Sequence, residues 1–109
     1  MQTLDRVFGA LSDRTRRAIL VRLGQGEATV SELAAPFDMS MPAITKHLNV
    51  LEQAGLVTRR RDGRTKRCRL NPDGAESAHA WIAQQTRFWN AGLDRLDSML
   101  ATEKAGQDG

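Results

Sequence analysis

A chain of 109 residues with 40% apolar content is long enough for one domain with a modest core, and its net charge of +3 is too small to indicate a partner by itself. The lone cysteine, Cys68, excludes an intrachain disulfide, no apolar run is long enough to span a membrane, and the first residues lack the apolar core of a signal peptide. We therefore expect a cytoplasmic protein with one domain over residues 1–102 and a disordered polar tail over residues 103–109.

The first residues of the chain predict two helices. Ser12-Asp13 has the residue types that cap a helix, so a second helix should begin there and end at Gly24. The first helix is indicated by apolar residues at helical spacing, namely Leu4, Val7, Phe8 and Leu11. In the second helix we expect Ala18, Ile19 and Leu23 to face inward, and Arg14, Arg16, Arg17 and Arg22 to keep their charged heads in water.

A short helix is predicted after residue 29. Thr29 and Glu32 have the spacing of a capping box, in which the Thr hydroxyl and the Glu carboxylate cap the helix reciprocally. Pro36 cannot donate a backbone hydrogen bond, so this helix should end near Phe37.

A longer helix is predicted from Ser40 to Ala54. Ser40 is its N-cap, Pro42 is tolerated in its first turn, and Gly55 should end it with Leu56 packed back on the helix in a Schellman motif. Its apolar stripe consists of Ile44, Leu48 and Leu51. A short helix and a longer one joined by a few residues outline a helix-turn-helix.

Residues 57–70 predict a basic β-hairpin. Two extended runs flank Asp62-Gly63, whose residue types tolerate the positive φ of a tight turn. Seven basic side chains and one acid lie between Arg59 and Arg69, so the rest of the chain is slightly acidic. Such crowded cations repel one another unless an anion compensates, as DNA phosphates do. A solvated charged surface is the alternative, but the position directly after a helix-turn-helix favours DNA contact through Arg59, Arg60, Arg61, Arg64 and Lys66.

The start of the helix from Ser40 to Ala54 has the residue types of a recognition helix, which needs short groups near base edges and cations near phosphates. Thr45 can hydrogen-bond a base or offer its methyl group to thymine, Lys46 suits a phosphate, and His47 can donate to either. An ordinary surface helix is the alternative that the helix alone leaves open. The candidate DNA-binding residues are Ser40, Met41, Pro42, Ala43, Thr45, Lys46 and His47.

A long amphipathic helix is predicted after Pro72, and it carries both tryptophans. Completion of the monomer core is one interpretation of its apolar stripe, but the stripe is large for a terminal helix in so small a chain. We favour a dimer interface shared with the first helix, because paired helix-turn-helix proteins read two half-sites. The candidate interface residues are Leu4, Val7, Phe8, Trp81, Ile82, Phe88, Trp89, Leu93, Leu96 and Leu100.

No constellation of catalytic or metal-binding residues is recognisable. The two histidines, His47 and His79, lie in different elements, and no cluster of Cys and His has the spacing of metal ligands. We expect Cys68 to be an inward-facing strand residue, with a redox sensor as the alternative. The sequence therefore predicts no enzyme, no cofactor and no metal.

Four runs of the sequence follow one another along the chain, namely Leu11–Leu20, Val30–Ala34, Met39–Leu48 and Leu51–Val57. Together they resemble the ArsR-type winged helix-turn-helix regulators, and the resemblance covers about residues 4–100. The resemblance implies a mainly α, winged helix-turn-helix fold with a two-stranded β-hairpin wing and a long C-terminal dimerisation helix. It implies a homodimeric repressor with its recognition helix at Ser40–Ala54, its wing at Val57–Leu70 and its dimer surface on the first and last helices.

The sequence differs from the family's metal-sensing members at the metal-binding positions, which indicates the metal-independent branch. The residues around Phe88-Trp89 also resemble this branch. The positions of the metal-binding cysteines are Thr29 and Ser31 here, and His79 lacks the partners of the family's second metal site. We therefore expect a sequence-specific repressor that binds a palindromic operator in double-stranded DNA as a homodimer. Two alternatives stay open: a regulator gated by a small molecule or by Cys68 oxidation, and a protein–protein scaffold that does not bind DNA.

Overall fold

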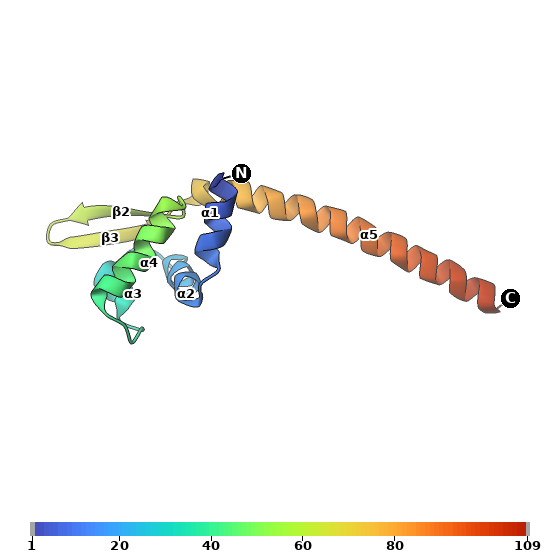
Figure 1. Cartoon of the computed structure of the whole chain (residues 1–109), viewed down its shortest axis with the longest axis horizontal. Coiled ribbons are helices and arrows are strands. Elements are labelled where there is room, and N and C mark those ends of the chain that lie inside the picture. Colours follow the sequence, from blue (N-terminus) through green and yellow to red (C-terminus); the bar gives the residue numbers. More distant parts are fainter. Residues whose placement is uncertain (1, 109) are drawn as a thin grey trace. The chain divides into compact units, whose positions relative to one another are not determined.

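The computed structural model describes the backbone of residues 2–108 and the side chains of residues 4–102. It divides the chain into two compact units, Met1–Ala78 and His79–Gly109, where the sequence predicts one domain over residues 1–102. The candidate DNA-binding residues and the buried core residues that the structure describes all lie in the first unit, which is drawn from blue to light orange in Figure 1.

Four helices precede the hairpin in the first unit, and three of them begin at a residue whose side chain caps the helix. They are α1 (Gln2–Leu11), α2 (Arg14–Leu23), α3 (Val30–Ala34) and α4 (Met41–Gln53). Asp13 caps α2, Thr29 and Glu32 form the predicted capping box of α3, and Ser40 caps α4. At the end of α4, Gly55 has a φ of 79°, and the amides of Gly55 and Leu56 donate to the carbonyls of Glu52 and Leu51. This is the predicted Schellman motif.

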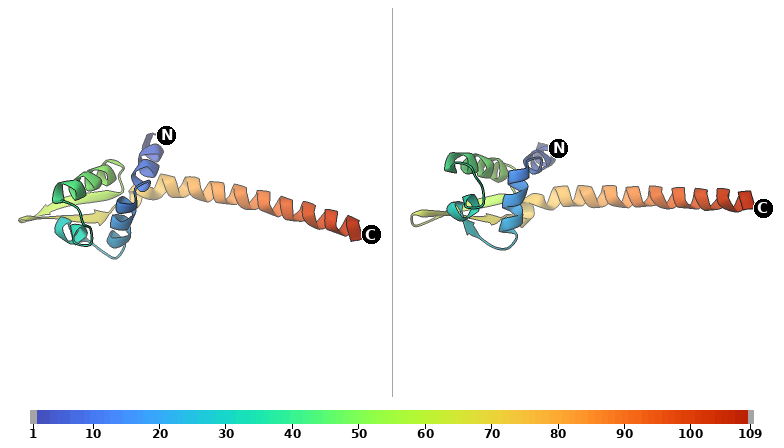
Figure 2. Two further views of the ribbon diagram at one scale, coloured as in Figure 1. Left: turned by 60° about the horizontal axis from the view of Figure 1, so that its bottom comes forward. Right: turned by 90° about the horizontal axis from the view of Figure 1, so that it is seen from below.

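The sheet of this unit has three antiparallel strands in the order β1-β3-β2. The wing is formed by β2 (Val57–Asp62) and β3 (Thr65–Leu70), and the turn that joins them projects beyond α3 and α4 (Figures 1 and 2). The third strand, β1 (Ala28–Thr29), pairs with Cys68 and Arg67 and was not predicted, because two residues carry no periodicity.

The turn of the hairpin lies one residue later than the sequence predicts. Asp62 pairs with Thr65, so the two turn residues are Gly63 and Arg64 and not Asp62-Gly63. Gly63 has a φ of 64°, and the positive φ values among the described residues all belong to glycines. A glycine at the first turn position with an ordinary second residue is the type II′ pattern, which matches the twist of a hairpin.

The core of the first unit corrects two predicted positions. Ala18 is exposed, because α2 turns Ile19 and Leu23 inward, one helical turn apart. Val7 is fully buried, because α1 packs against both α2 and α4, so Val7 belongs to the core and not to a surface offered to a partner. The largest fully buried side chains are Ile19, Leu33, Ile44, Leu48, Leu51, Val7, Val57 and Cys68.

The last helix, α5 (Glu76–Asp108), follows a short 3-10 turn, η1 (Pro72–Ala75). Gly74 has to be glycine, because a Cβ atom there would overlap the carbonyl group of Gly55. The helical backbone continues past residue 103, where the sequence predicts the disordered tail. No helix in the described part of the chain is long and apolar enough to cross a membrane.

Candidate nucleic-acid interface

The candidate residues of α4 fall into an exposed group and a half-buried group. Ser40, Met41, Pro42 and Lys46 are exposed, whereas Ala43, Thr45 and His47 are half-buried. Because successive residues of a helix are about 100° apart, Thr45 and His47 lie on opposite flanks of a face centred on Lys46. The Ser40 hydroxyl accepts from the Ala43 amide at 3.3 Å, so it is occupied as the cap of α4.

The Thr45 flank faces the wing across a shallow pocket of about 300 Å³. The pocket brings the start of α3 and the first two turns of α4 together with both strands of the hairpin. Hydroxyl groups and cations surround it, and Met41 adds an exposed apolar group at its edge. The lining residues are Thr29, Val30, Ser31, Met41, Thr45, Arg59, Arg64, Thr65 and Lys66.

Arg59 is attached to α4 by three side-chain hydrogen bonds. Its guanidinium donates to both carboxylate oxygens of Glu52 at 3.0 Å and to the Asn49 side chain at 2.6 Å. Only 16% of its side chain is exposed. The bond from Arg59 lowers the pKa of the Glu52 carboxyl and raises the pKa of the guanidinium. The charge of Arg59 is thus compensated within the protein, which argues against the predicted contact between Arg59 and DNA.

Arg60 is likewise engaged, with the carboxylate of Glu27 at 3.0 Å, and this bond lowers the pKa of Glu27. We call Arg59 and Arg60 the hairpin root. Near the turn, Arg67 pairs with Asp62 at 2.9 Å.

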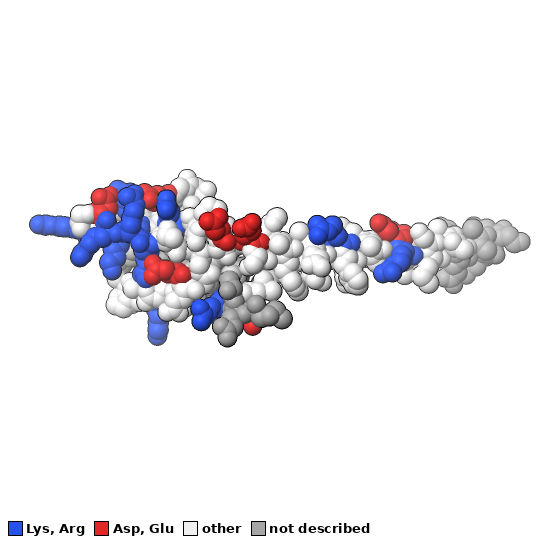
Figure 3. Space-filling model, turned by 90° about the horizontal axis from the view of Figure 1, so that it is seen from above, with Lys and Arg blue, Asp and Glu red and all other residues white. Residues whose placement is uncertain are grey.

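Arg61, Arg64 and Lys66 form the hairpin tip. Among the described residues they have no ion-pair partner within 4.0 Å, and all three side chains are exposed. Basic side chains gather at the end of this unit from which the hairpin turn projects (Figure 3). The tip is therefore the part of the wing whose positive charge is available to an external anion.

His47 faces the other side of α4, toward α1 and α2. Its Nδ1 lies 3.3 Å from the Arg16 guanidinium and 3.8 Å from a carboxylate oxygen of Asp13. Arg16 also donates to the carbonyls of Ala10 at 2.8 Å and Gly9 at 3.1 Å. The sequence did not single out Arg16 in this role, because His47 is 31 positions away.

Cys68 is fully buried on β3, between Ala28 of β1 and Arg59 of β2. Burial raises the pKa of its thiol, and the nearby Arg59 opposes this only in part. A buried, protonated thiol is a poor nucleophile and a poor metal ligand, so Cys68 is the inward-facing strand residue that the sequence predicts. The Thr29 hydroxyl bonds to Glu32, and no group of three or more potential metal ligands occurs among the described residues.

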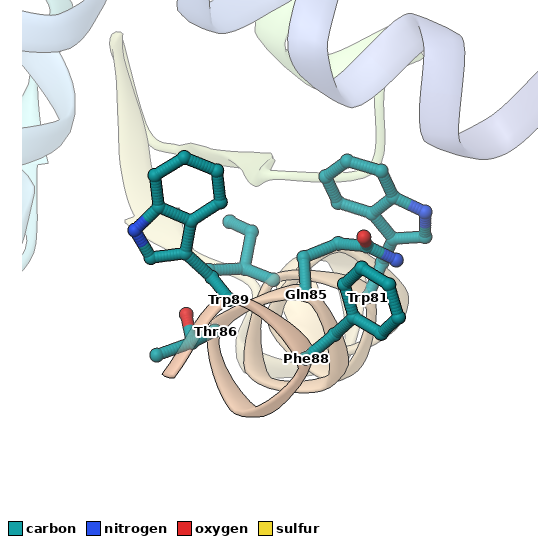
Figure 4. A pocket seen from close by; sticks show the side chains of 6 residues that line it. Trp81, Gln85, Thr86, Phe88 and Trp89 are labelled. Atoms are coloured by element: carbon teal, nitrogen blue, oxygen red, sulfur yellow. The ribbon is translucent and has the colours of Figure 1, made fainter. Parts of the chain in front are cut away.

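The described part of α5 exposes a nearly continuous apolar stripe. Phe88 and Trp89 are 70% and 69% exposed, and both line a groove of about 430 Å³ along the helix. In Figure 4, Trp81 and Phe88 lie on one side of Gln85 and Trp89 lies on the other. The exposed apolar residues of the stripe are Trp81, Ile82, Phe88, Trp89, Leu93, Leu96, Met99 and Leu100. Leu4 and Phe8 of α1 are half-buried against the core of the first unit.

Comparison with known proteins agrees with this geometry. Residues 11–60 match a family model described as a helix-turn-helix domain. The HTH-type transcriptional regulator Rv2034 of Mycobacterium tuberculosis is 37% identical over 91% of this chain and 90% of its own length.

Two solved structures are also similar to this chain. One is an ArsR family transcriptional regulator, RHA00566, with 43% identity, a TM-score of 0.76 and coverage of 82% of this chain and 92% of that one. The other is the homodimeric winged helix-turn-helix DNA-binding domain Mb0332 of Mycobacterium bovis, a possible ArsR-family regulator. It has 27% identity, a TM-score of 0.63 and coverage of 80% and 82%.

Proposed function

Since this chain belongs to the ArsR family of winged helix-turn-helix transcriptional regulators, we propose that it is a metal-independent homodimeric repressor that binds a palindromic operator. Transcriptional regulators of this family are not enzymes, and the chemistry described above gives no reason to assign a reaction. A regulator that occupies chromosomal DNA acts in the cytoplasm, which is where we place this one.

The proposal is best supported by the position of the hairpin tip, which lies beside the Thr45 flank of α4. Arg64 and Lys66 line the same pocket as Met41 and Thr45, so cations and uncharged groups lie side by side. Phosphate contacts supply affinity and base contacts supply specificity. We assign the tip to phosphates of the DNA backbone, and Met41 and Thr45 to base edges in the major groove.

The apolar stripe of α5 supports the homodimer. A continuous apolar surface of this kind marks an interface, and the similar domain Mb0332 is described as homodimeric. We propose that the stripe pairs with a second copy, and we keep Leu4 and Phe8 of α1 as further candidate interface residues. Two recognition helices held about 34 Å apart would read both halves of a palindrome in successive major grooves.

Metal independence rests on the chemistry of Thr29 and Ser31. Hydroxyl groups do not bind soft metals as thiolates do, and the Thr29 hydroxyl is already bonded to Glu32. Gating by Cys68 oxidation is disfavoured, because the thiol is buried and its pKa is raised.

Selection of bound fragments from the genome that encodes the chain, followed by footprinting, tests the proposal. We expect an enriched palindrome, protection of both half-sites, and increased transcription from the neighbouring promoter when the protein is removed. Zinc, cadmium or arsenite should leave operator occupancy unchanged, with Cys68→Ser as the control for nonspecific thiol chemistry. Failure to enrich any fragment would favour the scaffold alternative. Release by stoichiometric metal that persists in Cys68→Ser would contradict metal independence.

A further inference from the structure

Arg16 connects three parts of the first unit through one guanidinium group. Its Nε donates to the Ala10 carbonyl at 2.8 Å and its Nη2 to the Gly9 carbonyl at 3.1 Å, so it is bonded to two carbonyls near the end of α1. Its Nη1 lies 3.3 Å from His47 Nδ1 on α4. A planar fork of this kind fixes the position of all three nitrogens, which a lysine ammonium cannot do.

These contacts determine which nitrogen of His47 carries the proton. A guanidinium has donors only, so Nδ1 must accept from Arg16, and the proton of the neutral ring is then on Nε2. Asp13 would favour a proton on Nδ1, but its carboxylate oxygen is farther away, at 3.8 Å, and it already accepts from the Arg16 amide at 3.0 Å. The shorter contact therefore favours the tautomer with its proton on Nε2.

His47 Nε2 has no hydrogen-bond partner among the described residues, and 22% of the side chain is exposed. Its flank of α4 is opposite the one that faces the wing. A helix in the major groove has a phosphate backbone on each side, so a donor on this flank meets the backbone that the hairpin tip does not reach.

We propose that Arg16 is a positioning residue that holds His47 with its Nε2–H directed at a DNA phosphate, and thereby ties the end of α1 to the recognition helix. The inference rests on the proposed function, since it assigns one more contact to the same DNA interface. With the contact from His47, α4 has a phosphate contact on each flank. Two such contacts fix the rotation of the helix about its own axis in the groove.

Two substitutions separate the roles of the two ring nitrogens. In His47→Gln the side-chain amide can occupy the place of Nε2 and donate to a phosphate. In His47→Asn the amide falls near Nδ1 and leaves no donor at the Nε2 position. We expect His47→Gln to bind the selected operator within about threefold of wild type. His47→Asn should lose about tenfold for each protomer bound, because each protomer loses one charge-assisted hydrogen bond.

Arg16→Lys should also weaken operator binding about tenfold. The matched control is Arg17→Lys, because Arg17 donates to the Leu11 carbonyl of α1 but has no bond to His47. Thermal unfolding of each variant separates a loss of fold from a loss of contact.

Nitrogen-15 NMR of the His47 ring in the free, full-length protein reads the tautomer directly and does not depend on DNA. We expect the proton on Nε2 in wild type and in Arg17→Lys, and a mixture of tautomers in Arg16→Lys. A proton on Nδ1 in wild type, or full operator affinity of a folded His47→Asn, would overturn the proposal. If wild type binds no DNA, the proposed function fails and the phosphate contact fails with it, whereas the ring spectrum still decides the role of Arg16.

Discussion

The root and the tip of the β2–β3 hairpin use the same residue type for two different purposes. At the root, Arg59 and Arg60 bind Glu52 and Glu27, so their charge is compensated within the protein. At the tip, Arg61, Arg64 and Lys66 are exposed and have no ion-pair partner among the described residues. The density of arginine in a sequence therefore does not measure the charge that a partner meets. What matters is which cations the fold has already paired.

The largest expected effect comes from separating the two copies, because two hairpin tips act on one operator only if the chains pair. Leu96 is exposed within the α5 stripe, so Leu96→Asp should leave the monomer folded and place an unpaired charge in the dimer interface. Such a charge costs several kcal/mol, and operator affinity should fall at least about a hundredfold.

Sedimentation equilibrium of Leu96→Asp and wild type measures the change of oligomeric state. Ser98→Asp is the matched control, because Ser98 is also exposed on α5 but lies away from the stripe by helical periodicity. A wild-type monomer that binds a palindrome tightly would exclude the two-fold arrangement.

Removing the tip cations should weaken binding to every DNA. In the double variant Arg61→Ala with Arg64→Ala, the loss of about 1 kcal/mol per phosphate contact reduces affinity roughly 30-fold for each protomer bound. The reduction should be alike for operator and random duplexes, because phosphates carry no sequence information. Titration of both duplexes by fluorescence anisotropy measures it, and a loss confined to the operator would assign base contacts to the tip.

Thr45 tests whether the flank of α4 that faces the wing reads bases. Thr45→Ala removes a hydroxyl and a methyl group from the flank that faces the wing, and it should cost about 1–3 kcal/mol on the operator. Random DNA should be affected much less. Equal losses on both duplexes in the same titration would show that Thr45 does not read a base.

The root arginine Arg59 should affect stability and not DNA binding. Arg59→Ala deletes three hydrogen bonds that connect the wing to α4, and the free energy of unfolding should fall by about 1–2 kcal/mol. Urea unfolding measures the loss. Unchanged stability together with weakened DNA binding would place Arg59 in the interface after all.

The smallest effect concerns acid pH. The Arg59 bond lowers the pKa of Glu52 from its usual 4.5, so the folded protein binds fewer protons at this site than the unfolded chain. The pair therefore stabilises the fold above about pH 4.5 and loses its contribution as pH falls through the lowered pKa. Glu52→Gln should show a flatter decline of melting temperature in this window than wild type, and an identical decline would contradict the coupling.

Local features of this chain were predictable from the sequence. The caps at Asp13, Thr29 and Ser40 each depend on a hydrogen bond to a residue three positions away, and the Schellman motif at Gly55 depends on one backbone angle. The burial of Cys68 followed from the alternation of residues along its strand, whereas the full fold class followed from the family resemblance of four runs between residues 11 and 57.

Pairings between distant residues were not predictable in the same way. Glu27 and Arg60 are 33 positions apart, and they meet because the register of the sheet places Thr29 beside Arg67 and Arg67 beside Arg60. The one-residue shift of the hairpin turn has a similar origin, since it is the register that pairs Asp62 with Thr65. The division of the wing into root and tip, and the role of Arg16, therefore required the structure.

The salt dependence of operator binding tests most directly whether the tip, and not the root, carries the charge that meets DNA. Wild type is compared with the tip variant Arg61→Ala with Arg64→Ala and with the root variant Arg59→Ala with Arg60→Ala, which loses the same formal charge. Each phosphate contact adds about 0.9 to the slope of log affinity against log salt. We expect the slope to fall by about two units per protomer in the tip variant and to stay at the wild-type value in the folded root variant. Equal decreases in both variants would contradict it.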